Sequence, residues 1–157
     1  MMRLSRELAP EVFEALLDEY QRLLRELLGS MGGQDVDVED DTAVAIFSTA
    51  KEAVLAAVAV QRAVAAHEWP HGREIAMSIG LDGGDPGQAT LRCSDLCDAA
   101  EGGQIFLTPE TSSLLEQEGL DDLSMRDLGE VSLRRSDRTV RAYELVVPAS
   151  GLPSGPA

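Results

Sequence analysis

Carboxylates are concentrated in one short stretch of this chain. Five acids fall within seven residues, at Asp35, Asp37, Glu39, Asp40 and Asp41. Carboxylate oxygens are the ligands that Mg²⁺, Mn²⁺ and Ca²⁺ prefer in proteins. An EF-hand loop counted from Asp35 needs Gly at its sixth place and Glu at its twelfth, but Asp40 and Ile46 stand there. The spacing excludes that calcium motif and favours a solvated acidic turn over a metal site of another kind.

Two pairs of residues could also do chemistry. Cys93 and Cys97 stand four apart in an expected helix and therefore share one face, but two thiols alone do not make a zinc site. His67 and His71 flank a Trp-Pro dipeptide at the expected end of a helix. Because no Ser or Cys nucleophile is recognisable beside them, we expect a surface turn there, and reduced thiols at the cysteines.

Glycines between two later elements suggest a phosphate-binding loop at first sight. Gly83, Gly84 and Gly87 lack the Lys-Ser/Thr pair that follows in such loops. The chain also carries 13 Lys plus Arg against 28 Asp plus Glu, a formal net charge of −15. Such a charge repels phosphate backbones and anionic lipid surfaces. We therefore expect a turn here, and neither nucleic acid nor membrane as a partner.

Apolar periodicity predicts the elements that position these residues. We expect helices over residues 10–28, 49–67, 89–101 and 109–118, a β-hairpin over residues 32–47, and strands over residues 73–82, 104–107, around 131 and 140–147. Thr49 with Glu52 three residues later fits a capping box. This order predicts an α+β fold with helices on one side of a mostly antiparallel sheet.

Length and composition limit the domain count and the compartment. With 157 residues, 44% of them hydrophobic, the chain predicts one domain with a real core. No stretch of eighteen uninterrupted apolar residues occurs, and the start lacks the apolar segment of a signal peptide. We therefore expect a cytoplasmic protein. The last ten residues, rich in Pro, Gly and Ser, predict a flexible tail.

Several segments resemble, in the same order, the catalytic domains of class III nucleotidyl cyclases. Residues 32–47 resemble the family's metal-binding hairpin, residues 3–24 its first helix, residues 59–84 the run from a later helix into a strand, and residues 99–111 and 125–134 later parts. The resemblance covers residues 2–147. It implies a ferredoxin-like cyclase-homology domain over residues 1–147, followed by the tail at 148–157, and it implies that the family's first strand is missing.

The resemblance also implies roles residue by residue. Asp41 takes the place of one of the family's two metal-binding aspartates. The lysine that reads the purine corresponds to Asp35, or to Asp37 if the register slips by two. Leu91 and Asp95 stand where the family has an Asn and an Arg that stabilise the transition state. These substitutions remove base recognition and positive charge, so a self-dimer should be inactive.

From this resemblance we expect a non-catalytic cyclase-homology domain, a regulatory or dimerisation module in bacterial cyclic-nucleotide signalling. Its expected partner is itself or an intact cyclase-like subunit, and no cofactor is expected. The alternative is the metal-binding half of a heterodimeric cyclase that makes cAMP or cGMP from ATP or GTP, with Mg²⁺ or Mn²⁺ at Asp41. A missing strand would leave its two neighbours with unpaired backbone groups, so we also expect an upstream extension or a dimer that closes the gap.

Overall fold

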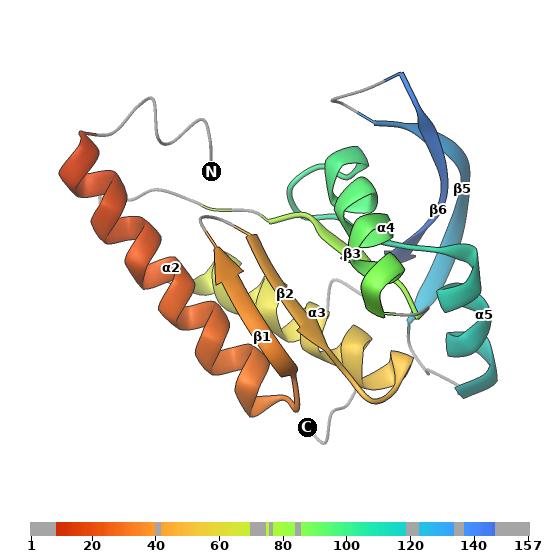
Figure 1. Cartoon of the computed structure of the whole chain (residues 1–157), viewed down its shortest axis with the longest axis horizontal. Coiled ribbons are helices and arrows are strands. Elements are labelled where there is room, and N and C mark those ends of the chain that lie inside the picture. Colours follow the sequence, from red (N-terminus) through yellow and green to blue (C-terminus); the bar gives the residue numbers. More distant parts are fainter. Residues whose placement is uncertain are drawn as a thin grey trace.

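The computed structural model describes residues 9–39, 42–69, 75, 77–83, 86–118, 123–133 and 137–146. The elements in chain order are α2 (Pro10–Ser30), β1 (Gln34–Glu39), β2 (Thr42–Ile46), α3 (Ala50–Ala66), β3 (Ile79–Leu81), α4 (Pro86–Ala99), β4 (Ile105–Leu107), α5 (Pro109–Glu118), β5 (Ser124–Ser132) and β6 (Thr139–Val146). Figure 1 shows the β1–β2 hairpin beside α2, with β3 to β6 on its other side. The α+β class predicted from the sequence is confirmed.

Helix α2 packs against the hairpin through one apolar side. Pro10 lies in its first turn, where the missing N–H costs no hydrogen bond. Leu16, Tyr20 and Leu24 follow at four-residue spacing, and all three are buried. Gly32 then adopts φ +93°, a left-handed conformation that glycine reaches without strain. This turn directs the chain back so that β1 packs against the helix.

Helix α3 is held at its start by the predicted cap and is buried along much of its length. Thr49 Oγ1 accepts a hydrogen bond from the Glu52 N–H at 3.1 Å, which satisfies one of the free N–H groups of the first turn. Its apolar residues serve two separate clusters. Val60 and Val64 pack with the buried residues of α2, whereas Val54, Ala57 and Val58 pack with β4, α5 and β6.

The strands form two sheets within the described part of the chain. β1 and β2 pair antiparallel in a two-stranded sheet. The second sheet has the order β3-β4-β6-β5, in which only the β3–β4 pair is parallel. The mostly antiparallel pairing is therefore confirmed. No ladder joins β2 to β3 among these residues.

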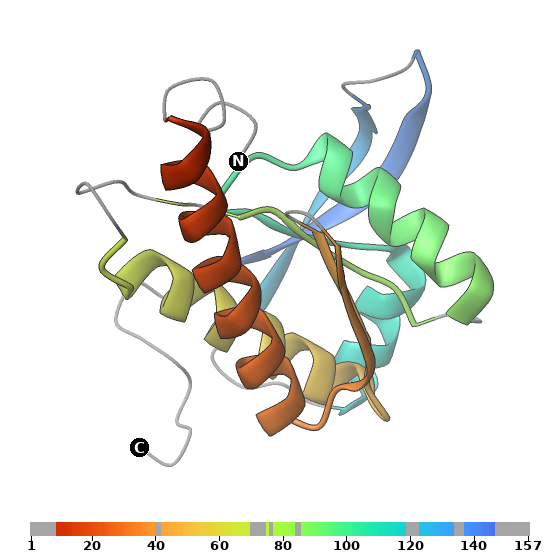
Figure 2. The ribbon, with the colours of Figure 1, turned by 60° about the vertical axis from the view of Figure 1, so that its left-hand side comes forward.

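Helices cover both faces of the four-stranded sheet, so the expectation of helices on one side is wrong. Ile105, Leu107 and Leu145 pack with α3 and α5. Phe106 and Ala142 pack with Leu96 and Ala100 at the end of α4. Alternating residues of a strand point to opposite faces, and β4 is buried on both. Figure 2 shows α4 and α3 on opposite sides of this sheet.

Glycine at residue 80 lets α4 lie close to β3. A Cβ at this position would stand 2.5 Å from the Cys93 carbonyl oxygen and 2.9 Å from the Leu96 Cβ. Any side chain would therefore push the helix away from the strand. The close contact fixes the position of α4 relative to β3, and therefore which side of the helix faces solvent.

The largest boundary differences from the sequence predictions concern one strand and one helix. The strand expected over residues 73–82 covers only Ile79–Leu81 in the described residues, and residues 73, 74 and 76 lie outside them. Helix α4 begins at Pro86, three residues before its expected start, because proline suits a first helical turn. The strand at β4, the helix α5 and the closing β5–β6 hairpin are confirmed. The expected tail at 148–157 lies outside the described residues.

Candidate functional site: the hairpin and helix α4

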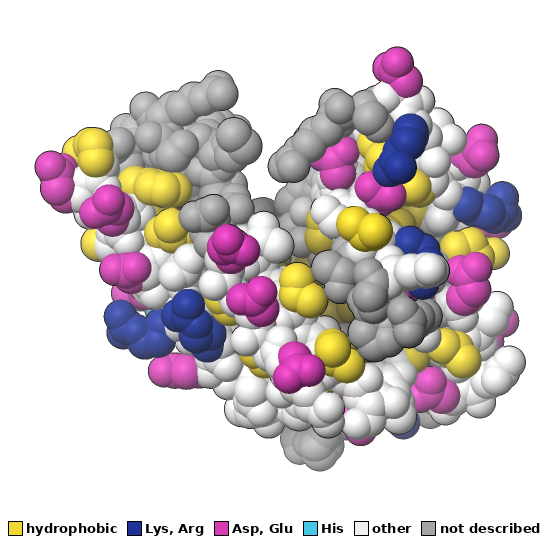
Figure 3. Space-filling model, viewed as in Figure 1, with side chains coloured by type: hydrophobic (Ala, Val, Ile, Leu, Met, Phe, Trp, Pro, Cys, Tyr) yellow, Lys and Arg dark blue, Asp and Glu magenta, His cyan; other side chains and the backbone are white. Residues whose placement is uncertain are grey.

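The outer face of the hairpin is acidic. Asp37 and Glu39 stand opposite Val44 and Thr42 in the ladder, and all four side chains are exposed. Asp35 is exposed too, and its φ of 50° places it in the left-handed region, which aspartate tolerates better than most residues. Figure 3 shows acidic side chains over the hairpin on this face of the molecule. We call these five exposed residues of β1 and β2 the hairpin face.

The described residues do not form a metal site here. Among them, no group of three or more His, Cys, Asp or Glu side chains is placed to hold a metal ion. Asp40 and Asp41 lie outside the described residues, so the role that the resemblance implies for Asp41 stays a prediction.

Helix α4 presents the two positions where an amide and a guanidinium were expected to be lost. Leu91 is 70% exposed, and its side chain has no hydrogen-bonding group. Asp95, one turn later, accepts a hydrogen bond from Arg138 Nη2 at 2.7 Å. The resemblance implies a negative charge at Asp95 where the family has a positive one, and the structure places an arginine beside it. Arg138 comes from the segment that leads into β6, and no sequence motif pointed to it.

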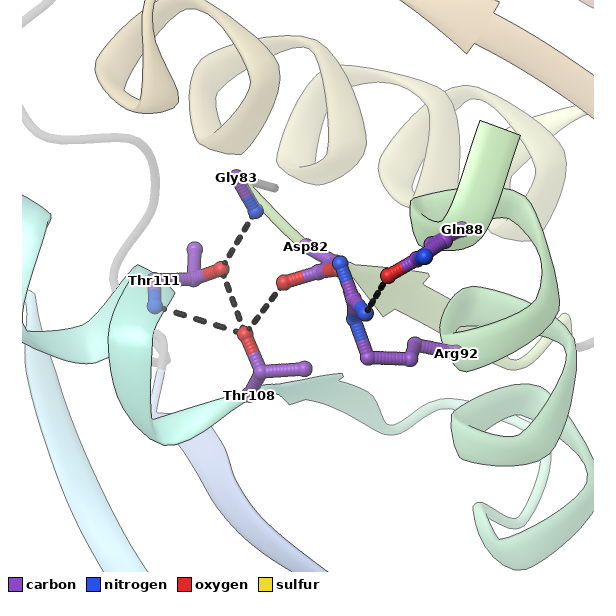
Figure 4. A network of polar contacts seen from close by, with 6 residues as sticks. All are labelled: Asp82, Gly83, Gln88, Arg92, Thr108 and Thr111. Atoms are coloured by element: carbon purple, nitrogen blue, oxygen red, sulfur yellow. Dashed lines mark hydrogen bonds and ion pairs between the residues drawn. The ribbon is translucent and has the colours of Figure 1, made fainter. Parts of the chain in front are cut away.

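A polar network joins the ends of β3 and β4 to α4 and α5 (Figure 4). Asp82, just after β3, accepts hydrogen bonds from Thr108 Oγ1 at 2.7 Å and from Arg92 Nε. Thr111 Oγ1 accepts a bond from the Gly83 N–H at 2.8 Å and lies 2.8 Å from Thr108 Oγ1. The Thr108 side chain also accepts a bond from the Thr111 N–H at 3.3 Å. Thr108 thereby caps α5.

The network ties α4 and α5 to the ends of β3 and β4. The Asp82 side chain is 1% exposed and that of Arg92 is 41% exposed. The hydrogen bond from Arg92 to Asp82 raises the pKa of the guanidinium. Both carboxylate oxygens have a donor, as buried charges require. Sequence analysis missed this network, because its members are far apart in the chain and belong to no motif.

The two cysteines of α4 are free thiols and are partly buried. Burial, with a smaller contribution from the Asp82 charge, raises the pKa of Cys93 to about 12. Burial also raises the pKa of Cys97. Both thiols are free and stay protonated near neutral pH, which makes them poor nucleophiles and metal ligands. The expectation of reduced, structural thiols agrees with this geometry.

His67 links the end of α3 to α2. Its Nε2 lies 3.1 Å from Glu19 Oε2, and its ring centroid lies 4.2 Å from that of the buried Trp69. The Trp69 indole N–H donates to the Val64 carbonyl at 2.9 Å. The expected helix-end turn therefore includes a packed aromatic contact. His71, its predicted neighbour, lies outside the described residues.

Comparison with solved structures defines the fold. The chain matches the adenylyl cyclase CyaB from P. aeruginosa at TM-score 0.66 and 22% identity, covering 96% of this chain and 90% of that one. The guanylyl cyclase domain of the RhoGC fusion protein from Blastocladiella emersonii matches at TM-score 0.73 and 14% identity, covering 94% and 88%. An adenylate/guanylate cyclase/hydrolase from Silicibacter pomeroyi matches at TM-score 0.59 and 26% identity, covering 84% and 83%.

These matches show that the chain has the fold of class III adenylate/guanylate cyclase catalytic domains. The resemblance stated from the sequence and its ferredoxin-like fold class are thereby confirmed. No protein-family model and no curated protein sequence matches the chain. None of the helices that the structure describes is long and apolar enough to span a membrane.

Proposed function

We propose that this chain is a non-catalytic cyclase-homology domain that acts through protein contacts, as a regulatory or dimerisation module in cyclic-nucleotide signalling. The observation that carries this proposal is the chemistry of two side chains on α4, Leu91 and Asp95. Leu91 offers no hydrogen bond where the family's Asn is expected, and the Asp95 carboxylate stands where the family's Arg is expected. Loss of one such donor commonly costs about 10²–10³ in kcat.

The hairpin supports the same proposal. An adenine-reading lysine is replaced by Asp35, or by Asp37 in the slipped register, and both carboxylates are exposed on a strand without any lysine or arginine. Both would repel the phosphates of a nucleotide. Fold retention combined with an acidic site favours a scaffold that binds another protein, either a second copy or an intact cyclase-like subunit.

A cyclase assay tests the loss of catalysis. Folded protein is incubated with Mn²⁺ and either ATP or GTP, and cyclic nucleotide is measured by mass spectrometry. We expect none above the buffer background. The S. pomeroyi protein is a suitable positive control, because it is described as an adenylate/guanylate cyclase/hydrolase. Turnover by this chain alone would overturn the proposal.

One observation favours a second function, the metal-binding half of a heterodimeric cyclase. Arg138 brings a guanidinium beside Asp95, so positive charge is not lost from this part of α4. In this alternative, Asp41 would hold Mg²⁺ or Mn²⁺ and a partner would supply the base-reading face. Co-expression with a cyclase-like subunit that lacks its own metal aspartates should then yield cAMP or cGMP. Asp41→Ala should abolish the product, whereas Arg141→Met, a change in an exposed ion pair, should not.

A further inference from the structure

A hollow of about 390 Å³ lies at one end of the four-stranded sheet. Among the described residues, β4 pairs with β6 at Tyr143 and Glu144, whereas β5 stays paired with β6 as far as Val146. The hollow is found where β4 and β6 separate. Its described lining comes from α3, the turn before β4, and strands β5 and β6: Gln61, Gly103, Arg126, Glu144, Leu145 and Val146. Small-molecule sites have volumes of about 300–1,000 Å³, so this hollow has room for a small ligand.

The charged groups of the wall leave hydrogen-bond donors over. Glu144 accepts a bond from Arg126 Nη2 on one carboxylate oxygen and from Gln104 Nε2, at 3.4 Å, on the other. The Glu144 side chain is 15% exposed, whereas that of Arg126 is 65% exposed. A guanidinium has five N–H groups in a planar fork, and the bond to Glu144 uses only one of them. The carboxylate is therefore engaged, while the arginine keeps donors for a further partner.

Gln61 of α3 adds a second donor to the wall. Its side-chain nitrogen is shielded from solvent and makes no hydrogen bond to any described residue. Buried polar groups in proteins nearly always have a partner, and one without a partner costs free energy. The last torsion of a glutamine side chain has a broad range, so a small rotation turns this N–H towards the hollow. The unpaired amide therefore indicates a place for a hydrogen-bond acceptor that the chain itself does not supply.

The remaining side chains of the wall are apolar. Leu145 is 4% exposed and belongs to the cluster beneath α3, and its neighbour Val146 is 41% exposed. Gly103 adds no side chain, and a Cβ at this position would meet no atom within 4 Å. The hollow thus combines two donors with an apolar surface, which is the usual composition of a site that orients a small organic molecule.

We infer that this hollow binds a small organic acid. Its carboxylate accepts hydrogen bonds from Arg126 and Gln61, and its apolar body lies against Leu145 and Val146. Arginine is suited to this task because its fork of N–H groups matches the two oxygens of a carboxylate. A cationic ligand fits less well, since both oxygens of Glu144 already accept a hydrogen bond.

The site is separate from the α4 positions that carry the proposed function. Arg126 faces Glu144 near the start of β5, whereas the other end of the β5–β6 pair is the contact of Ser132 with Thr139, next to Arg138. The strand between the two ends is about 20 Å long at about 3.3 Å per residue. The inference therefore goes beyond the proposed function and does not depend on the loss of catalysis.

Titration of the full chain with benzoate tests the inference, with benzyl alcohol as the matched ligand that lacks the carboxylate. Ligand-observed NMR measures the dissociation constant. The variants are Gln61→Leu and Arg126→Met, and the control is Arg141→Met, which removes an arginine from another ion pair of the same two strands. We expect benzoate to bind the wild type and the control alike, and each of the other two variants at least about tenfold more weakly, because a hydrogen bond to a charged group is lost. Benzyl alcohol should bind at least about tenfold more weakly than benzoate for the same reason.

Unfolding in urea separates lost binding from lost folding. Gln61→Leu should be as stable as the wild type or more stable, because an apolar group of similar shape replaces an unpaired donor. Circular dichroism confirms that the variants are folded. If Arg126→Met does not fold, because it leaves Glu144 without its cation, Gln61→Leu alone decides the outcome.

Four outcomes would overturn the inference: no binding of benzoate to the folded wild type, equal affinity for benzyl alcohol, unchanged affinity in Gln61→Leu, or equal weakening in the Arg141→Met control. These outcomes are separate from those of the cyclase assay. Turnover of ATP or GTP removes the non-catalytic function and leaves the acid site standing. Absence of benzoate binding removes the acid site and leaves the proposed function standing.

Discussion

Asp82 and Arg92 form an ion pair whose members have very different surroundings. The carboxylate is buried beneath α4 and α5, and the guanidinium reaches solvent. Removing the acid leaves a cation that water can still solvate. Removing the arginine leaves a buried carboxylate that accepts a hydrogen bond from the Thr108 hydroxyl, and an uncompensated buried charge is costly. The two members of one pair should therefore respond unequally to mutation.

We expect Arg92→Met to destabilise the fold more than Asp82→Asn. In the first variant the charge left behind is buried, whereas in the second the amide can still accept from Thr108. Urea unfolding followed by circular dichroism measures the difference. Arg141→Met is the matched control, because its pair with Asp127 is exposed on both sides and should change stability by less than about 1 kcal/mol. Equal losses in all three variants would contradict this account.

The Cys93 thiol predicts a loss of stability at alkaline pH. Its pKa is raised from 9.0 to about 12, so the folded protein holds this proton more tightly than the unfolded chain does. The contribution to stability is complete below pH 9 and is lost as the pH rises from 9 towards 12. Over that range, the urea midpoint should fall more steeply in the wild type than in Cys93→Ala. If the urea midpoints of the two proteins fell equally with pH, the pKa of the Cys93 thiol would not be raised by folding.

At the scale of elements, the contact between β3 and α4 depends on one glycine. Gly80 stands where a side chain would meet the backbone of α4, and Asp82 two residues later binds Arg92 on the same helix. The strand and helix are thus joined by close packing and by an ion pair. Gly29, near the end of α2, has open space around its Cα, and a Cβ there would meet no atom within 4 Å.

We expect opposite effects from the same substitution at these two glycines. Gly80→Ala should cost about 1–3 kcal/mol, because the strand must move away from Cys93 and Leu96. Gly29→Ala should stabilise by up to about 1 kcal/mol, because alanine loses less backbone entropy in a helix. Chemical denaturation of both variants measures this contrast. A neutral Gly80→Ala would mean that α4 and β3 are farther apart than the structure places them.

At the scale of the whole molecule, the net negative charge disfavours the compact folded state. A formal net charge of −15 on 157 residues creates self-repulsion that folding intensifies. The paired acids of β5 and β6 reduce this repulsion locally, but the hairpin face does not. Exposed charges respond to salt, because screening shortens the reach of each one.

We therefore expect the melting temperature to rise when NaCl is increased from about 0.02 M to about 0.5 M, a range over which the Debye length falls well below 10 Å. Differential scanning fluorimetry measures this change. A variant with Glu14→Lys, Asp18→Lys and Glu26→Lys at exposed positions of α2, whose charge is less negative by six units, should show a smaller rise. A melting temperature that falls with salt in the wild type would mean that attractive ion pairs outweigh the net repulsion.

Local patterns in the sequence predicted more of this molecule than its long-range contacts. The Thr49 cap, the alternating hairpin and the amphipathic α2 are each encoded by neighbouring residues, and all three were predicted correctly. Gly80, Asp82 and Thr108 depend on partners that only the folded chain brings together. Arg138 beside Asp95 was missed for the same reason, since 43 residues separate the pair. The cover of both sheet faces was missed because a fully apolar strand such as β4 shows no alternation.

Helix α3 divides its apolar residues between two clusters, and this division has a consequence for how the chain folds. The contacts of α2, the hairpin and the second half of α3 join segments that follow one another within residues 10–66. The second cluster, in contrast, includes Val54 of α3 and Leu145 of β6 and must bring together segments 91 residues apart. Low contact order favours early formation. During synthesis, the amino-terminal half can therefore assemble first. The side of α3 that is still exposed at that stage is the side against which the later strands pack.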